Sequence, residues 1–385
     1  MDRSKWEVYN KTFGEVFDLF MGRTPSRDND SYWQNGKYEW LSIGDMGETK
    51  YLSKTKEMVS EEAVANMQQV PENTVVMSFK LSIGKVGITS IPLFTNEAIM
   101  AFPPKKDYHI LPTFLYYYLK AYKWQSANRA VMGKTLNKAV ISNARISIPP
   151  IADQQRIVAE LDCLNEMIVV KKEQLKEFDK LAQSIFYDMF GNGSWKISKI
   201  KDIATVKIGP FGSALHQSDY ISGGTPLVNP VHMVNGAIIA DNDFTVSSDK
   251  ISELKPYLLK TNDVVFGRRG DIGRCALVTE NESGYLCGTG SMYVRFNIDI
   301  DPVYALKILS SEGTRKYLLD NAKGATMLNI NGGIVENIEI PLPPLSLQQQ
   351  FADKISAIEA QKELVKQSIA ETQHLLDYTM DKYFG

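Results

Sequence analysis

Apolar residues recur at steps of mostly three, four or seven positions in two long stretches of the chain, which is the period of one face of an α-helix. Neither stretch contains an internal Pro or Gly. Each begins just after a pair of prolines and ends at a Gly, as helices commonly do. We therefore predict two long helices, over residues 149–191 and 343–385. At 1.5 Å per residue, about 36 helical residues would make a rod of roughly 54 Å.

An isolated helix of that length would expose its apolar face to water. Two such faces in one chain most simply pack on each other, so we expect a coiled coil whose helices are either parallel or antiparallel. The residues expected to make this helix–helix packing are Leu161, Leu164, Leu175, Leu181, Ile185, Ile355, Ile358, Ile369 and Leu375.

The two helical stretches are copies of one sequence. Pro149-Pro150 recurs as Pro343-Pro344, at a spacing of 194 residues. The repeat continues into the parts that precede the helices, where the segment at 73–76 recurs at 262–265. A period of this length is far above that of a solenoid, and it implies two copies of a large module in a pseudo-twofold repeat.

The parts before the helices mix strand and helix patterns. Short β-branched runs such as residues 75–76 and 264–265 predict strands. The order is mostly strands, then a helix, then a strand, which argues against a doubly wound parallel sheet. The sequence therefore predicts an α+β fold with mixed α/β domains at 1–148 and 192–342 and helices at 149–191 and 343–385.

Composition limits the class of protein. The chain has 385 residues, 44% of them hydrophobic, which is enough for two or three domains with cores. Three cysteines without a CxxC pair favour a reducing cytoplasm over a disulfide scaffold or a zinc site. No signal peptide is visible and no stretch approaches the roughly 18 apolar residues that span a membrane. We therefore expect a cytoplasmic protein without a membrane partner.

The net charge of −2 argues against nucleic acid at first sight. Acidic residues exceed basic ones in both predicted helices, however, so the rest of the chain is slightly basic. Any DNA-binding face would have to be a local patch on the two globular parts.

Residues suited to catalysis are scarce. The four histidines form no HExxH or other metal-ligand spacing. The Gly-Lys-Thr at 133–135 lacks the glycine that a P-loop needs five residues earlier, where Asn128 stands. No nucleophile with a matching base can be identified. We expect no catalytic residue, no metal site and no cofactor.

Two pairs of repeated segments are candidates for binding. Residues 266–274 place Arg268, Arg269 and Arg274 between glycines, and the matching segment of the first half carries Lys80 and Lys85. Glycines allow a close approach, and arginines suit phosphates and the guanine edge. The second pair of segments offers Lys134, Thr135 and Asn137 in the first half and Lys323, Thr326 and Asn329 in the second. An ordinary solvated hairpin or turn is the alternative for both pairs.

These patterns together resemble the specificity (S) subunit of type I restriction-modification systems, over the whole length of the chain. The resemblance rests on the two repeated segments that begin IPPIADQQRI and LPPLSLQQQF. It also rests on GRTPS near the start and on NTVVMSFKLSIGK and NDVVFGRRGDIGR in the globular parts.

The resemblance implies a function. Each globular part would be a target recognition domain for one part of a bipartite, asymmetric double-stranded DNA site. The helices would fix the spacing and dock two methyltransferase (M) subunits, which can recruit restriction (R) subunits. Catalysis would lie on these partners, and the chain itself would be no enzyme. Two alternatives stay open: an enzyme with a fused recognition domain, and a coiled-coil scaffold whose heads bind protein or sugar.

Overall fold

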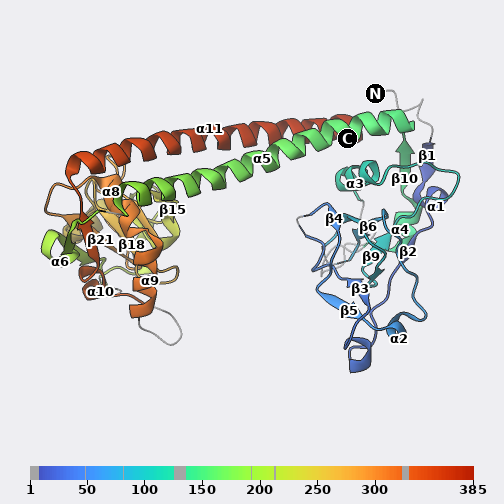
Figure 1. Cartoon of the computed structure of the whole chain (residues 1–385), viewed down its shortest axis with the longest axis horizontal. Coiled ribbons are helices and arrows are strands. Elements are labelled where there is room, and N and C mark those ends of the chain that lie inside the picture. Colours follow the sequence, from blue (N-terminus) through green and yellow to red (C-terminus); the bar gives the residue numbers. More distant parts are fainter. Residues whose placement is uncertain are drawn as a thin grey trace. The chain divides into compact units, whose positions relative to one another are not determined.

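The computed structural model of the chain describes residues 8–47, 49–80, 82–124, 136–191, 193–211, 214–322 and 329–385. The chain divides into two compact units (Figure 1). The first unit comprises Met1–Glu173 and Lys366–Gly385, and the second comprises Gln174–Val365. Two long helices, α5 (Ile151–Phe190) and α11 (Leu345–Phe384), each contribute one part to each unit. Both helices lie within the ranges 149–191 and 343–385 that the sequence predicts.

A five-stranded sheet forms the centre of the first unit, with strand order β2-β9-β6-β7-β4. Its strands are β2 (Phe20–Met21), β9 (Ile99–Ala101), β6 (Val75–Ser78), β7 (Val86–Thr89) and β4 (Tyr51–Leu52). A smaller sheet has the order β5-β3-β8. Its strands are β5 (Glu57–Val59), β3 (Tyr38–Leu41) and β8 (Phe94–Thr95). Strand pairing is mainly antiparallel, but β3–β8 and β4–β7 are parallel pairs.

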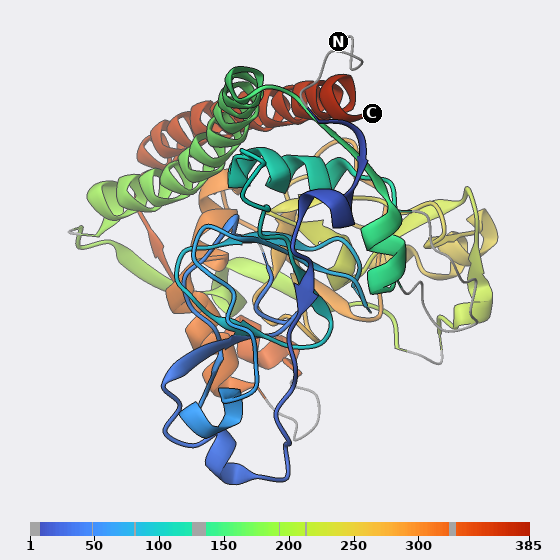
Figure 2. The ribbon, with the colours of Figure 1, turned by 90° about the vertical axis from the view of Figure 1, so that its right-hand side faces the viewer.

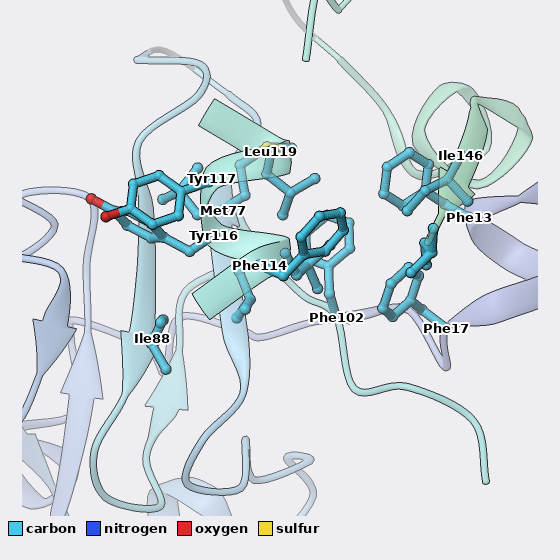
Figure 3. Packing of buried hydrophobic residues seen from close by; sticks show 14 of the residues in the cluster. Phe13, Phe17, Met77, Ile88, Phe102, Phe114, Tyr116, Tyr117, Leu119 and Ile146 are labelled. Atoms are coloured by element: carbon cyan, nitrogen blue, oxygen red, sulfur yellow. The ribbon is translucent and has the colours of Figure 1, made fainter. Parts of the chain in front are cut away.

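Helix α3 (Pro112–Ala121) lies between this sheet and the ends of the long helices, as Figures 1 and 2 show. Its Phe114 packs with Phe13, Phe17 and Phe102 in one buried cluster (Figure 3). Leu161 and other residues of the long helices belong to the same cluster. The first unit therefore has one core that includes the domain, the start of α5 and the end of α11.

The second unit repeats this plan with shorter strands in places. Its main sheet has the order β12-β21-β18-β19, and a second sheet has the order β13-β17-β14-β20. The main strands are β12 (Ala204–Ile208), β21 (Ser291–Phe296), β18 (Val264–Gly267) and β19 (Cys275–Leu277). The others are β13 (Tyr220–Ile221), β17 (Thr245–Val246), β14 (Thr225–Val228) and β20 (Leu286–Cys287). Helix α8 (Pro302–Leu309) takes the place of α3.

A further strand pair links the two ends of each globular part. In the first unit, β1 (Val8–Thr12) pairs antiparallel with β10 (Arg145–Ile148). In the second, β11 (Lys196–Lys199) pairs antiparallel with β22 (Glu339–Leu342). The short helices α4 (Lys138–Asn143) and α10 (Gly332–Glu336) precede β10 and β22. The pair returns the chain to the point where the long helix begins.

Repeated Asn and Gly residues have the same backbone conformation in both units. Asn73 and Asn262 precede the strands β6 and β18 and have positive φ values of 56° and 71°. Asn tolerates this left-handed conformation better than most residues with a side chain. Gly84 and Gly273, in the loops that follow the same strands, both have a φ of 87°. The repeated Asn and Gly are therefore explained by two turns that each unit needs.

The repeated prolines and glutamines anchor the start of each long helix. Pro150 O accepts hydrogen bonds from the backbone N–H groups of Asp153 and Gln154, so the second proline closes the first turn. The buried Gln154 side chain donates to Pro149 O over 3.0 Å and accepts from Leu111 N over 2.9 Å. Its counterpart Gln348 makes the equivalent bonds, to Pro343 O and from Asp301 N.

Contacts within each unit show that α5 and α11 are antiparallel. In the first unit, Lys171 Nζ of α5 donates to Ser368 Oγ and Thr372 Oγ1 of α11, each over 2.8 Å. In the second unit, Lys362 Nζ of α11 lies 2.8 Å from Asp179 Oδ1 of α5. The start of one helix thus pairs with the end of the other, which decides between the two orientations that the sequence left open.

Seven of the nine residues predicted for helix packing are buried or partly buried. These are Leu161, Leu164, Leu175, Ile185, Ile355, Ile358 and Ile369. The prediction is wrong for the other two, because Leu181 and Leu375 are 47% and 51% exposed. The following residues, Ala182 and Leu376, are the buried ones.

Candidate nucleic-acid interface

The loop from Arg268 to Arg274 connects β18 to β19 in the second unit. Arg274 forms a 2.9 Å ion pair with Asp271, which also lies 3.3 Å from Arg315 of α9 (Glu312–Asn321). Arg274 Nη1 donates to Pro230 O over 3.2 Å. This arginine, predicted as a DNA contact, has a structural role in holding the loop.

The matching loop of the first unit connects β6 to β7 and is held in the same way. Lys85 Nζ donates to Ile43 O over 3.2 Å. Ile43 lies two residues beyond β3, as Pro230 lies two residues beyond β14. Lys85 and Arg274 are equivalent in the repeat. Each hydrogen-bonds the segment that follows a strand of its own unit's second sheet, β3 in the first unit and β14 in the second, and so holds its loop in place. Lys80 is half-buried beside the ring of Phe79, with its Nζ 5.5 Å from the ring centroid.

Two segments that the sequence singled out separately meet in the second unit. Arg269 and Asn329 form a β-bridge, and Arg268 Nε donates to Asn329 Oδ1 over 3.3 Å. Arg269 is exposed, whereas Arg268 is only 7% exposed. Burial lowers the pKa of Arg268, and the neighbouring charge of Arg269 lowers it further. The loop therefore presents one free-standing arginine to solvent and keeps another in its interior.

Asn137 lies beside the first-unit loop but caps a helix. Its side chain accepts a hydrogen bond from Val140 N over 2.9 Å at the start of α4. Asn331 caps α10 in the same manner, accepting from Ile334 N over 3.0 Å. The predicted DNA contact at Asn137 thus has a structural explanation. Four further candidates, Lys134, Thr135, Lys323 and Thr326, lie outside the described residues.

The long helices carry a second candidate surface that the sequence analysis missed. Val170 of α5 and Leu364 of α11 are equivalent in the repeat, and each is 60% exposed. Leu181 and Leu375 are also equivalent and exposed. The first unit holds Val170 and Leu375, and the second holds Leu364 and Leu181. We call Val170 with Leu375, and Leu364 with Leu181, the outer pairs. In the sequence they are apolar residues that do not all fit one helical face, and the sequence pattern predicts Leu181 and Leu375 to lie on the packed face.

The described residues offer little for catalysis. They contain no group of three or more His, Cys, Asp or Glu that could hold a metal ion. Burial raises the pKa of Cys275 to about 12, so its thiol is protonated at neutral pH and is a poor nucleophile. No helix in the described ranges is long and apolar enough to cross a membrane.

Comparison with known proteins identifies what this arrangement resembles. Residues 3–178 and 192–374 match the family described as the type I restriction modification DNA specificity domain. The MjaIX specificity subunit of Methanocaldococcus jannaschii is 23% identical over 375 residues, which cover 90% of this chain and 85% of that protein.

Solved structures show the same fold. A chain from a structural study of assembly and conformational transition in the type I R-M system aligns with a TM-score of 0.66 at 17% identity. The alignment covers 97% of this chain and 96% of that one. The type I S subunit of M. genitalium aligns with a TM-score of 0.52 at 14% identity, over 99% of this chain and 97% of that one.

Proposed function

The chain belongs to the family of type I restriction-modification specificity subunits and carries two DNA specificity domains, and we propose that it recognises a bipartite, asymmetric double-stranded DNA site without catalysing a reaction itself. One observation carries this proposal: the two units share a frame but differ in the loop that follows the central strand. Lys80 stands where the second unit has Arg269, and Phe79 stands where it has Arg268. Unlike loops on like frames suit two unlike half-sites.

The exposed Arg269 and its half-buried counterpart Lys80 are the proposed DNA contacts of these loops. They would neutralise phosphates, which take most protein–DNA hydrogen bonds and set the register of the protein on the duplex. Lys85 and Arg274 add positive charge while their hydrogen-bonding groups hold the loops. Lys134, Thr135, Lys323 and Thr326 stay candidates on the grounds of sequence alone.

We propose that the long helices set the distance between the half-sites. Each has 40 residues, about 60 Å at 1.5 Å per residue. That length corresponds to roughly 18 base pairs at 3.4 Å each. Two half-sites with a non-specific gap between them fall on this scale.

The outer pairs are the proposed docking surfaces for two methyltransferase subunits. A large apolar side chain that is half exposed or more is common by itself. Its recurrence at equivalent positions of both helices is what supports docking, because two identical partners require two equivalent surfaces. Catalysis would then reside on the methyltransferase subunits, and restriction subunits would join through them.

Genome-wide mapping of methylated bases in cells that express the methyltransferase subunit with and without this chain tests the proposal. We expect methylation at one bipartite asymmetric sequence only when both are present. The purified chain alone should transfer no methyl group. Methylation of a contiguous symmetric site, or methyl transfer by the isolated chain, would contradict the proposal.

A further inference from the structure

Arg268 occupies a position that belongs to the hydrophobic core in the other copy of the module. Its counterpart Phe79 is 1% exposed. The two residues have the same backbone surroundings: Leu136 N donates to Phe79 O over 3.2 Å, and Ile330 N donates to Arg268 O over 3.0 Å. The second unit has therefore placed a guanidinium where the first places a phenyl ring.

This guanidinium has no ion-pair partner within the described part of the chain. Among the described residues, its one side-chain hydrogen bond runs from Nε to Asn329 Oδ1, and neither terminal nitrogen has an acceptor there. The same unit pairs another arginine fully, since Arg295 binds both carboxylate oxygens of the buried Asp263 over 2.8 and 2.6 Å. Burying a charged group without a partner destabilises the folded state, because the lost hydration is not replaced. An acceptor from outside the chain would remove that cost.

We propose that Arg268 is a specificity-determining residue of the second unit, and that its terminal nitrogens donate to the O6 and N7 atoms of a guanine. This inference rests on the proposed function in DNA recognition. The bond to Asn329 fixes the side chain through Nε and leaves both terminal N–H groups for a ligand. A paired acceptor edge matches that fork, and Arg to guanine is the commonest specific contact of this kind.

A DNA phosphate would offer similar acceptors to a guanine edge. Comparison with the neighbouring Arg269 distinguishes these two ligands. Arg269 is exposed and suits the DNA backbone, whereas Arg268 lies in the interior of the loop, where geometry is restrained. Phe79 cannot make either contact, so the first unit must read its half-site by other groups. The proposal therefore assigns this guanine to the second half-site only.

The test compares Arg268→Met with the matched control Arg269→Met, in the complex of the full chain with its methyltransferase subunits. DNA binding is measured on a library randomised at each half-site, at several salt concentrations. We expect Arg268→Met to lose roughly tenfold or more in affinity for the native site and its preference for guanine at one position. Preferences at the other half-site should not change. Arg269→Met should weaken binding uniformly and reduce the salt dependence.

Unchanged preference at every position in Arg268→Met would overturn the proposal. So would a uniform loss with a reduced salt slope, which would assign the residue to a phosphate. Arg268→Lys keeps the charge without the rigid fork and should weaken the guanine preference, which guards against misfolding of the methionine variant. If the unmodified complex shows no bipartite preference, the proposed function fails instead, so the two failures are distinguishable.

Discussion

At the scale of the residue, one helical position separates a core side chain from a surface one. Leu181 and Leu375 are exposed, while Ala182 and Leu376 beside them are buried. Steps of three or four residues can pass through either neighbour, so periodicity alone does not fix the phase. Leu161 is buried, and neither of its sequence neighbours, Glu160 and Asp162, is apolar.

Shortening a buried leucine of α5 should cost far more than shortening an exposed one. We expect Leu161→Ala to lower the free energy of unfolding by about 2–5 kcal/mol, because it leaves a cavity in the core of the first unit. Leu181→Ala is the control and should stay within about 0.5 kcal/mol. Thermal unfolding of both variants measures the difference, and equal effects would contradict the assignment.

His232 should make the second unit sensitive to mild acid. Its ring is buried, its Nδ1 accepts from Asn229 N over 3.1 Å, and burial lowers its pKa. The unfolded chain therefore binds a proton more readily than the folded one. The stability that the neutral, buried His232 contributes is fully present above the ordinary pKa of about 6.5. It declines as the pH falls below that value.

The measurement is the unfolding temperature of the full chain between about pH 7.5 and about pH 5.5, roughly one unit on either side of the ordinary histidine pKa. His232→Asn is the control, because it keeps an acceptor near Asn229 N and does not titrate. We expect the wild-type chain to lose more stability than this variant over the interval. Parallel pH profiles would show that another group is responsible.

At the scale of the element, the sequence determined which segments are helices but not how they pair. Proline pairs and terminal glycines marked the ends of α5 and α11 within two residues. Their direction depends on single polar contacts such as Lys171 with Ser368, which an apolar pattern does not contain. The parallel pairs β3–β8 and β14–β20 were also beyond prediction, because their partners lie far apart in the sequence.

The end of α11 should be essential to the first unit. Tyr383 is buried in its core, and the neighbouring Phe384 ring lies 5.6 Å from that of Phe114. We expect Tyr383→Ala to destabilise this unit by about 3 kcal/mol. Tyr378→Ala, which shortens an exposed tyrosine of the same helix, should have little effect on the unfolding temperature. Similar losses in both variants would contradict this role.

At the scale of the whole molecule, the sequence shows the duplication, but it does not separate structural basic residues from candidate DNA contacts. Lys85 and Arg274 brace their loops and Asn137 caps a helix. A basic side chain looks the same in a sequence whether it holds its own loop or faces a ligand. Only the hydrogen-bond partners separate the two roles.

Shortening both long helices should shorten the gap between half-sites. Four residues removed from the middle of each helix, close to one turn, would shorten it by about 6 Å, or roughly two base pairs. Nearly one full turn keeps the packed faces in register. We expect the methylated sequence to keep its half-sites and lose about two base pairs of gap. An unchanged gap would contradict the spacing role.

The division of the chain into units has a consequence for its synthesis. The second unit is a continuous segment, Gln174–Val365, whereas the first needs residues 366–385 to complete it. Domains usually fold in the order in which the ribosome makes them. Here the order is reversed, because the unit made first stays open until the end of α11 has emerged. A chain that ends just after residue 365 would therefore have a complete second unit and an incomplete first one.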